Sequence, residues 1–276
     1  MPGAGSAIAA NYIYGVAKPD GLTLGIINGG LYLDQILARR EIKFDWPGFS
    51  WVGSSTPADL LLYMWANSPY KTIHDVRNAE VAPKCGATGA ATGGNYVPKL
   101  IEETIGAKFN VVLGYQGGAD IDLAVEKGEV QCRALGSAGF FSREPFHTWR
   151  KKGLVRVLVQ TGNKRDARLP DVPTIHELMD QYNTANSSRR LARAMLGAGG
   201  FGTWPMIAPP SMPEERLKTL RAAFVKAVNN ADLLAEAATR GIEVELIKAE
   251  DLKGLAKEVS TQPPEVISSM KKLLGK

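Results

Sequence analysis

The sequence predicts an α/β fold of mainly parallel sheets flanked by helices, and three features of residues 84–161 support it. Short apolar segments alternate there with glycine-rich turns and amphipathic helices, which is the pattern of repeated βαβ units. The apolar run Phe109–Leu113 lies between Gly106 and Gly114, so we expect a strand buried on both faces. The segment that precedes this strand predicts an amphipathic helix, whose apolar face consists of Val97, Leu100, Ile101 and Ile105. Strands joined by such helices are parallel, so their glycine turns all fall at the carboxyl edge of the sheet, where open α/β sheets bind ligands.

The chemistry of these turns favours a small anion. In the turn Thr88–Asn95 almost no side chain separates the backbone amides from solvent, and a helix from about Asn95 would direct its free N–H groups and positive dipole end there. The turn Tyr115–Asp120 is of the same kind, and Gly29-Gly30 is a third. For any single glycine, tight packing of the turn is as good an explanation as ligand binding. Three glycine-rich turns in one sheet favour a binding site. The candidate ligand-binding residues are Thr88, Gly89, Ala90, Ala91, Thr92, Gly93 and Asn95 in the first turn, and Tyr115, Gln116, Gly117, Gly118 and Asp120 in the second.

Composition narrows the possible functions. The chain has 276 residues, enough for two domains, with a net charge of +5 that suits an anionic ligand. No apolar run approaches the ~20 residues of a membrane span. Lys and Arg are scattered, without a basic helix that carries stacking aromatics, so nucleic acid is not an expected partner. Because Cys85 and Cys132 form no metal motif and the histidines stand far apart in sequence, we expect no metal, no cofactor and no catalytic residue.

The first part of the chain predicts a second group of strands and helices. In chain order we expect a helix that carries Ile8 to Val16, a buried strand Leu22–Ile27, a helix Leu31–Arg40, an aromatic-rich loop Phe44–Phe49, and strands Trp51–Ser54 and Asp59–Trp65. A helix opens at Pro69–Thr72. The glycine turn Pro2–Ser6 has no strand before it, so we expect a longer precursor with a signal peptide and a first strand–helix unit.

The last part of the chain is mostly helical. Thr174 and Glu177 fit a capping box at a helix start, and Gly241 suits the end of another helix. Gly197–Gly202 is either a hinge between domains or a surface loop. The remaining elements, in order, are a polar, aromatic-bearing connector Arg143–Lys152, a buried strand Leu154–Gln160, a surface helix or loop Asn183–Arg193, a strand broken by prolines from Gly202, a helix from Pro213, a half-exposed strand Ile242–Ile247, and helices Glu250–Val259 and Pro264–Leu274.

Several stretches together resemble the solute-binding proteins of tripartite tricarboxylate transporters, which are also called Bug receptors or TctC-like proteins. The matching pieces are PGAGS (Pro2–Ser6), KPDGLTLG (Lys18–Gly25), GATGAATGG (Gly86–Gly94), VVLGYQGGADIDLAVEKGEV (Val111–Val130), RLPDVPTIHEL (Arg168–Leu178) and APPSMPEERLKTLRAAF (Ala208–Phe224). The likeness runs in register over nearly the whole chain. The segment 183–198, with its three arginines, is unlike the usual family sequence and indicates a subgroup with a different ligand or partner.

This resemblance implies a two-domain, type II-like periplasmic binding protein with the ligand cleft between its domains. Domain 1 would comprise residues 1–69 and 203–276, and domain 2 residues 70–202. The ligand would be a small di- or tricarboxylate or a related organic acid, held by Gly3, Ala4, Gly5 and Ser6 of domain 1 and by the two turns of domain 2. The resemblance further implies a periplasmic location, a membrane permease as partner, and a monomer that carries out no catalysis.

The resemblance also bears on the cysteines. Cys85 and Cys132 each precede a glycine of the binding edge by four residues, and in a strand order 2-1-3-4 their strands are neighbours. Neighbouring strands lie ~4.8 Å apart, within the reach of a disulfide, and a periplasmic location permits oxidation. Bridging two strands of one sheet strains the bond, however, and a buried free cysteine packs well. We therefore expect two nearby thiols in the reduced state.

Two other function classes compete with a transport receptor. The first is an α/β enzyme that binds a nucleotide or phosphate ligand. Gly3-Ala4-Gly5 begins like a dinucleotide fingerprint, but Ile8 occupies the position that needs Gly or Ala, and no phosphate-binding loop or nucleophile elbow occurs. The second is a sensor component that presents its ligand to a receptor rather than to a permease.

Overall fold

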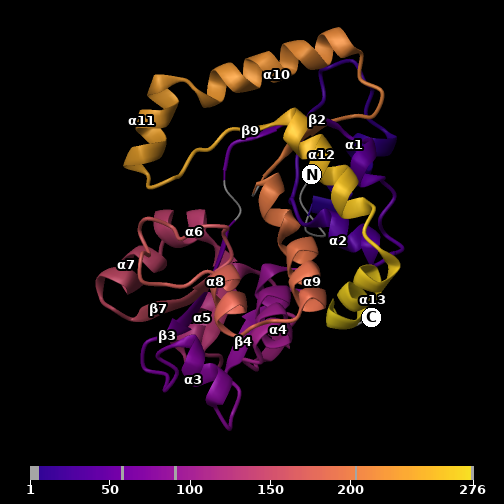
Figure 1. The fold of residues 1–276 in the computed structure, drawn as a ribbon. Coiled ribbons are helices and arrows are strands. Elements are labelled where there is room, and N and C mark those ends of the chain that lie inside the picture. Colours follow the sequence, from indigo (N-terminus) through magenta and orange to yellow (C-terminus); the bar gives the residue numbers. More distant parts are fainter. Residues whose placement is uncertain (1–5, 57–58, 90–91, 203, 275–276) are drawn as a thin grey trace. The chain divides into compact units, whose positions relative to one another are not determined.

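The computed structural model describes residues 6–56, 59–89, 92–202 and 204–274, with the side chain of Ala198 excepted. The chain divides into two compact units (Figure 1). Unit 1 comprises Met1–Ala58 and Gly197–Ile267, and unit 2 comprises Asp59–Leu196 and Ser268–Lys276. Each unit contains one β-sheet and a set of helices, so the predicted α/β class is confirmed.

The sheet of unit 1 has four short strands that pair antiparallel, in the order β1 (Gly25–Ile26), β8 (Met206–Ala208), β2 (Ser50–Ser54) and β9 (Ile247–Lys248). The mainly parallel sheet predicted for each domain is therefore not found in unit 1. Three of these strands have only two or three residues, and such segments carry no periodicity that reveals their partner or direction.

An aromatic cluster forms the core of unit 1. Trp46 and Trp51 are fully buried, and their ring centroids lie 5.0 Å apart. Phe201 stacks on Trp51 at 5.3 Å. The segment 44–49, predicted as a loop, thus supplies three rings of this core, because large rings bury much apolar surface even where the backbone is irregular. The cluster consists of Tyr32, Phe44, Trp46, Phe49, Trp51 and Phe201.

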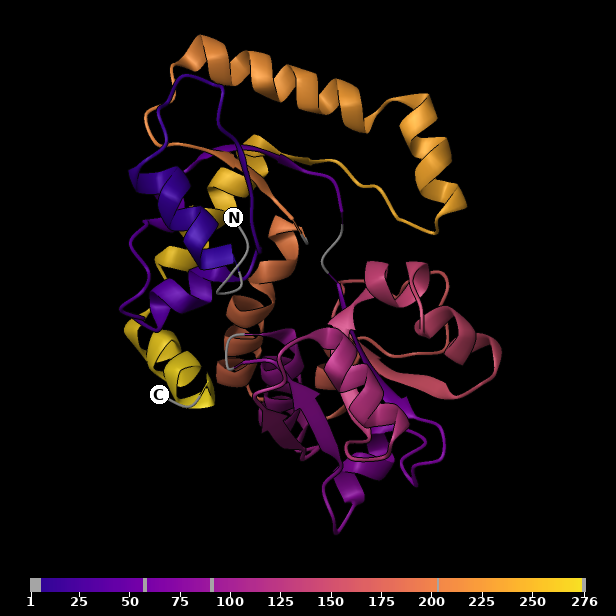
Figure 2. The ribbon, with the colours of Figure 1, turned by 180° about the vertical axis from the view of Figure 1, so that it is seen from behind.

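Helices cover this sheet and its core. α10 packs on β2 through a cluster that includes Val52 and Phe224, and the ring of Phe224 fills the space where a side chain at Gly53 would lie. Figure 2 shows α10 and α11 meeting at an angle, with α12 beneath α10. The helices of unit 1 are α1 (Ala7–Gly15), α2 (Leu31–Ile36), α10 (Glu214–Val228), α11 (Ala231–Thr239), α12 (Ala249–Ser260) and the short 3₁₀ turns η2 (Trp46–Gly48) and η3 (Gly197–Phe201). The last helix, α13 (Pro264–Leu274), begins in unit 1, and its residues from Ser268 onward belong to unit 2.

The sheet of unit 2 has five strands in the order β5 (Asn110–Leu113), β4 (Lys84–Ala87), β6 (Cys132–Gly136), β3 (Leu60–Trp65) and β7 (Val155–Gln160). β5, β4 and β6 are parallel, as the alternation of strands and helices predicts. β3 runs antiparallel to both of its neighbours, so the sheet is mixed. β5 and β7 are the two edge strands.

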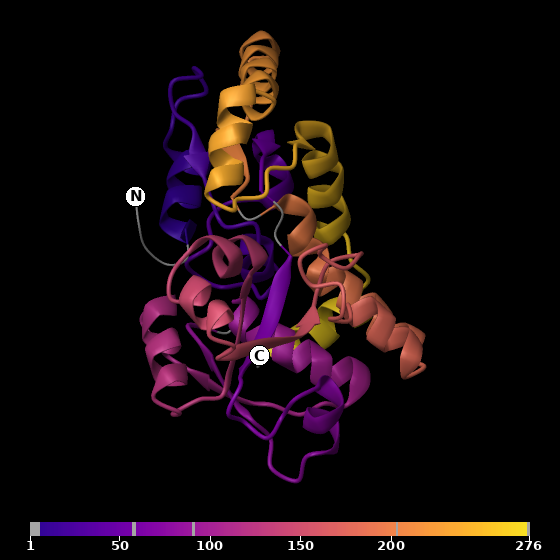
Figure 3. The same ribbon diagram turned by 90° about the vertical axis from the view of Figure 1, so that its left-hand side faces the viewer.

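Helices cover both faces of this sheet (Figure 3). Leu61 and Tyr63 of β3 belong to a core cluster with α5, α6 and α7, whereas the alternate residues Leu62 and Met64 are buried as well. The helices of unit 2 are α3 (Ile73–Asn78), α4 (Gly93–Ile105), α5 (Gly118–Glu126), α6 (Ser137–Ser142), α7 (Phe146–Lys151), α8 (Ile175–Gln181) and α9 (Asn186–Leu196). The capping box predicted for Thr174 and Glu177 is present at the start of α8.

Three sequence expectations for unit 2 differ from the structure. The strand 60–65 was assigned to the first domain, but β3 pairs with β6 and β7 inside the sheet of unit 2. β5 is an edge strand with exposed or half-buried residues rather than a strand buried on both faces. The segment 143–152 is not only a polar connector, because α7 buries Phe146 and Trp149 in the core. Local apolar patterns do not reveal which strand lies at an edge.

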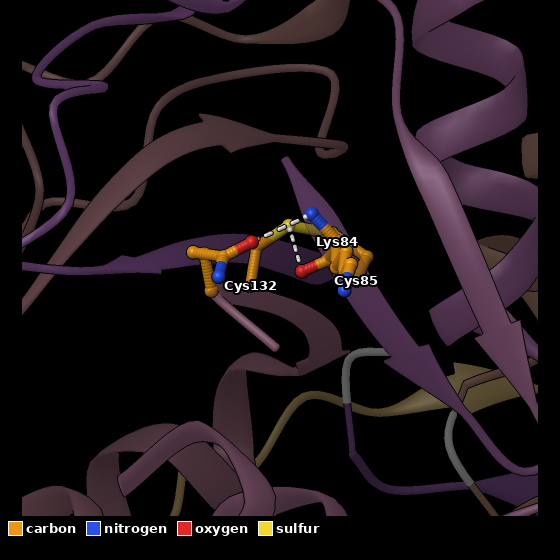
Figure 4. Close-up of a disulfide and its surroundings, with 4 residues drawn as sticks. Lys84, Cys85 and Cys132 are labelled. Atoms are coloured by element: carbon orange, nitrogen blue, oxygen red, sulfur yellow. Dashed lines mark hydrogen bonds between the residues drawn. A yellow bond between two sulfur atoms is a disulfide. The ribbon is translucent and has the colours of Figure 1, made fainter. Parts of the chain in front are cut away.

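Cys85 and Cys132 form a disulfide between β4 and β6 (Figure 4). The two residues are register partners in neighbouring parallel strands, with their Cα atoms 4.4 Å apart, so the predicted proximity is confirmed. The expectation of reduced thiols is wrong. Both residues are fully buried, and facing register partners bring their sulfurs together on one side of the sheet. At a sequence separation of 47 residues, the chain-entropy model assigns the bond about 4 kcal/mol.

Candidate functional site

The carboxyl edge of the unit 2 sheet brings together both glycine turns predicted from the sequence. β4 and β5 are adjacent and parallel, with Ala87 opposite Leu113 at their ends. The turn after β4 leads into α4, and the turn after β5 leads into α5. The starts of two helices therefore lie beside each other at one edge of the sheet, as the sequence pattern predicted.

The start of α4 has no side-chain cap. Its N-cap residue, Thr92, uses its hydroxyl to donate to the carbonyl oxygen of Gly89 at 2.8 Å and does not cap the helix. The first turn of the helix contains no acidic residue. The positive end of a 13-residue helix thus lacks a carboxylate or hydroxyl cap among the described residues. Such an end suits an anion.

Two glycines let α4 begin close against the sheet. A Cβ on Gly94 would lie 3.2 Å from the carbonyl oxygen of Gly86 and 3.1 Å from the Cβ of Ala87. A Cβ on Gly93 would lie 2.7 Å from a methyl group of Leu60. Gly94 therefore packs tightly against the backbone of β4, whereas at Gly93 only the flexible end of the Leu60 side chain would have to shift. Asn95 next to them is fully buried. Gly89 differs, since a Cβ there would meet only a methyl group of Thr92 at 3.9 Å.

The start of α5 is capped by its own sequence. The backbone N–H of Gly117 donates to the carboxylate of Asp120 at 3.0 Å, which completes a capping interaction in the first turn. Asp120 therefore places negative charge at this helix end. Tyr115 and Gln116 stand in the turn before it. Burial and the charge of Glu129 raise the pKa of Tyr115, so its phenol stays neutral.

Arg133 of β6 anchors the first turn of α5. Its guanidinium donates to the carbonyl oxygen of Gly118 at 2.9 Å and forms a buried ion pair with Asp122. The hydroxyl of Tyr63 donates to the same carboxylate at 3.2 Å, and burial raises the pKa of Tyr63. A Cβ on Gly118 would lie 2.4 Å from the guanidinium. Gly118 is therefore glycine because Arg133 fills that space.

The same edge continues across β6 and β3. Gly136 ends β6 opposite Leu60 at the start of β3, and a Cβ on Gly136 would meet no atom within 4 Å. The backbone N–H of Ser137 donates to the carbonyl oxygen of Asp59 at 2.8 Å, so an amide at the start of α6 is already bound.

Some predicted site residues fall elsewhere or are not described. Ser6 belongs to unit 1, where it precedes α1 with a positive φ of 81° and does not cap that helix with its side chain. Gly3, Ala4, Gly5, Ala90 and Ala91 lie outside the described residues. The sequence prediction treated both turns of unit 2 as equivalent. The signal that distinguishes them was present in the sequence, because α5 has an acidic residue, Asp120, at its third position and α4 has none in its first turn.

The arrangement provides amides and a helix dipole rather than a reactive side chain. Within the described ranges, no three His, Cys, Asp or Glu side chains come together as a metal site. None of the described helices is both long enough and apolar enough to span a bilayer. A site of this kind can hold and neutralise a small anion through backbone hydrogen bonds.

Solved structures of solute-binding proteins share this fold. The TctC solute-binding protein from Polaromonas, without ligand, aligns with a TM-score of 0.69 at 18% identity, over 99% of this chain and 84% of its own. MatC from Rhodopseudomonas palustris with bound malate aligns with a TM-score of 0.68 at 21% identity, over 99% of this chain and 86% of its own. Rpa4515 from R. palustris with adipate aligns with a TM-score of 0.68 at 18% identity, over 98% of this chain and 83% of its own. No curated protein sequence matches the chain.

The fold thus defines the class of two-domain solute-binding proteins, as the sequence predicted. The chain belongs to the tripartite tricarboxylate transporter family receptors, whose family model matches residues 1–271. The family and the fold are those of receptors rather than of enzymes.

Proposed function

We propose that the protein is an extracytoplasmic receptor that captures a small organic di- or tricarboxylate for a tripartite tricarboxylate-type transporter. The observation that carries this proposal is the uncapped start of α4, which follows a glycine turn at the carboxyl edge of the unit 2 sheet. One carboxylate of the ligand accepts hydrogen bonds from the amides at this helix start, and the helix dipole stabilises its charge.

Each part of the site then has its own role. Gly89 gives the ligand access. Among the described atoms, a Cβ added at Gly89 would contact only the methyl group of Thr92. Gly93 and Gly94 hold the helix start against β4 and Leu60. Tyr115 and Gln116 of the neighbouring turn contact the remainder of the ligand, and Gly3–Ser6 supply the contacts of domain 1.

Two complexes of proteins with this fold support a carboxylate ligand. MatC binds malate and Rpa4515 binds adipate, and both are dicarboxylates. Their fold matches that of this chain, and its family is named for tricarboxylate transport. We also propose a membrane permease as partner and a periplasmic location, which the same family membership supports.

The proposal is tested by calorimetric titration of the purified protein with malate, adipate, citrate, inorganic phosphate and ATP. We expect saturable binding of at least one of the three carboxylates and none of ATP. Gly89→Leu should remove that binding, because its side chain projects into the access path. Gly254→Leu is the matched control, since Gly254 is exposed on α12 in unit 1 and its Cβ would meet no atom within 4 Å.

Two results would contradict the proposal. Binding of ATP or phosphate in preference to every carboxylate would favour a nucleotide- or phosphate-binding protein. Equal carboxylate affinity in wild type and Gly89→Leu would separate the binding site from the α4 turn. Thermal melts of both variants without ligand show whether a loss of binding reflects unfolding.

A further inference from the structure

The sheet of unit 2 consists of two well-paired parts that meet between β4 and β6. In the first part, β5 and β4 share four register pairs. In the second part, β3 shares five register pairs with β6 and five with β7. Between β4 and β6, in contrast, the register among the described residues contains one pair, Cys85 with Cys132. We call this boundary the β4–β6 seam. Because register pairs carry the hydrogen bonds that join neighbouring strands, the seam has less backbone pairing than any other strand boundary of this sheet.

A disulfide and two hydrogen bonds fasten the seam where its strands begin. The Cys85–Cys132 bond joins the two strands (Figure 4). Beside it, the backbone N–H of Gln131 donates to the carbonyl oxygen of Lys84 at 2.7 Å. The Lys84 N–H donates in turn to the side-chain oxygen of Gln131 at 2.8 Å. Among these three contacts, the disulfide lies nearest to the carboxyl edge of the sheet, where β4 ends at Ala87.

The start of α4 rests on both parts of the sheet. On one side of the seam, a Cβ added to Gly94 would lie 3.1 Å from the Cβ of Ala87 in β4. On the other side, a Cβ added to Gly93 would lie 2.7 Å from a methyl group of Leu60, the first residue of β3. The body of the helix contacts both β4 and β6. The position of the amides at the helix start therefore depends on how the two parts of the sheet are held together.

The disulfide lies on the face of the sheet that α4 covers. Successive residues of a strand point to opposite faces, so the side chains of Cys85 and Ala87 point the same way, and Ala87 contacts the start of α4. Gly86 faces the other side, where an added Cβ would lie 2.5 Å from a methyl group of Ile121 in α5. Both cysteines are fully buried. The bond thus joins the two parts of the sheet directly beneath the helix that carries the candidate site.

We propose that the Cys85–Cys132 disulfide is a positioning element of the carboxylate site, which holds the two parts of the sheet in the arrangement that α4 requires for binding. This inference rests on the proposed function. Several amides must keep a narrow geometry to bind one carboxylate, so a small shift of the helix start weakens all of their hydrogen bonds together. Without the bond, the single register pair of the seam permits such a shift. Because disulfides form in the periplasm and not in the cytoplasm, the chain becomes a competent receptor only in the oxidising compartment.

Two variants without the bond and one matched control test the inference. Cys85→Ala/Cys132→Ala removes the bond, and Cys85→Ala/Cys132→Val removes it while restoring part of the lost apolar volume. Leu158→Ala is the control, because Leu158 is buried in β7, which β3 and β6 separate from the seam, and a cavity there destabilises the same unit. Each protein is titrated by calorimetry with malate, adipate and citrate at a temperature at which its melting curve shows it folded.

We expect the carboxylate affinity to fall about tenfold or more in both variants without the bond, because the site loses its preorganisation. Leu158→Ala should change the affinity by less than about twofold, since it lowers stability without loosening the seam. A purely stabilising disulfide would instead leave the affinity of the folded protein unchanged in all three variants.

A redox cycle on the unsubstituted chain separates the bond from the effects of substitution. In urea, dithiothreitol gives two electrons and two protons to the disulfide, which becomes two thiols, and the reductant becomes a cyclic disulfide. The chain is refolded with the reductant present and titrated. Oxidised glutathione then takes two electrons and two protons from the thiols, which reforms the bond and releases two molecules of reduced glutathione. We expect the affinity to fall in the reduced protein and to return after oxidation, with thiol counting as the check on each state.

Hydrogen exchange read by mass spectrometry tests the positioning role without any ligand. Loss of the bond should speed exchange in β4 and in the first turn of α4, and should leave β3 and its pairing with β6 protected. Leu158→Ala should not produce this local increase.

Four results would overturn the inference: unchanged affinity in both variants without the bond, an equal loss in Leu158→Ala, faster exchange spread evenly over unit 2, or failure of both variants and of the reduced chain to fold. The last result would assign the bond a purely stabilising role. If the oxidised, unsubstituted protein binds none of the three carboxylates, the proposed function fails instead, and hydrogen exchange still decides whether the bond positions α4.

Discussion

The starts of α4 and α5 look alike in sequence but differ in the structure. Each follows a glycine-rich turn at the end of a parallel strand, and the two strands are neighbours. At α5 the carboxylate of Asp120 caps the helix, and Arg133 holds its first turn. At α4 no acidic residue occupies the first turn, and the hydroxyl of Thr92 bonds to Gly89 instead. A glycine turn alone therefore does not identify an anion site; the helix end must also lack its own anion.

The other capped helices of unit 2 make the same point. Thr72 with Asp75 caps α3, and Thr174 with Glu177 caps α8, each through a complete capping box. These helix starts stabilise the fold with internal carboxylates. In our proposal, the ligand meets the same requirement at the start of α4.

The largest expected effect comes from blocking the α4 turn. Gly89→Leu should weaken carboxylate binding by about 100-fold or more, because the side chain excludes the ligand from several charge-assisted hydrogen bonds of about 1.5–3 kcal/mol each. Calorimetric titration measures the affinity, and a thermal melt checks the fold. Gly93→Leu is a poorer test, since its Cβ would press on Leu60 and alter packing as well.

Converting α4 into a helix that resembles α5 should have the next largest effect. Thr92→Asp places a carboxylate at the N-cap, where it competes with the ligand for the same amides. We expect roughly a tenfold or greater loss of affinity with no loss of thermal stability. Thr92→Asn, which caps without charge, should lose less. Equal losses in the two variants would show that charge at this helix end does not matter.

Removing the cap of α5 is the converse change. Asp120→Ala should destabilise the protein by about 1 kcal/mol, as expected for loss of a helix cap, and chemical denaturation measures this change. Carboxylate affinity should change by less than about twofold, because this helix start is not the anion site in our account. A strong gain or loss of affinity would transfer the site, or part of it, to the second turn.

The smallest effect concerns pH. Backbone hydrogen bonds at the helix starts lower the pKa of Asp75 and of Glu177, and Arg165 adds to the effect at Glu177. Since the folded-state pKa values are depressed, this stabilisation is present above the ordinary values of 3.8 and 4.5 and is lost as pH falls below them. Denaturation curves at several pH values should show a shallower acid-induced loss of stability in Asp75→Asn/Glu177→Gln. An unchanged slope would mean that these caps do not contribute.

Local patterns predicted much of unit 2 and little of unit 1. The alternation around residues 84–136 revealed parallel strands, and Cys85 and Cys132 were correctly expected on neighbouring strands. The antiparallel sheet of unit 1 could not be predicted, because strands such as β1 and β9 have two residues each and depend on partners far away in sequence. The disulfide was missed because the general strain argument outweighed the geometry of this one facing pair.

The candidate site divides in the same way. The sequence located both turns, since glycines and helix starts are local signals. It did not reveal that Gly93, Gly94 and Gly118 are set by contacts with Leu60, Gly86 and Arg133, because those contacts depend on the packed structure. It also did not reveal that Arg150 of α7 and Arg168, which follows β7, lie over the ring of Phe141.

The central claim is that the amides at the start of α4 bind the carboxylate, and backbone NMR tests it most directly. The protein labelled with ¹⁵N is titrated with whichever of malate, adipate and citrate binds in calorimetry, and the amide signals of Gly93, Gly94, Gly117 and Gly118 are followed. We predict large downfield shifts at Gly93 and Gly94 that saturate with the calorimetric affinity, and small shifts at Gly117 and Gly118. Large shifts confined to Gly117 and Gly118, with Gly93 and Gly94 unmoved, would contradict the account.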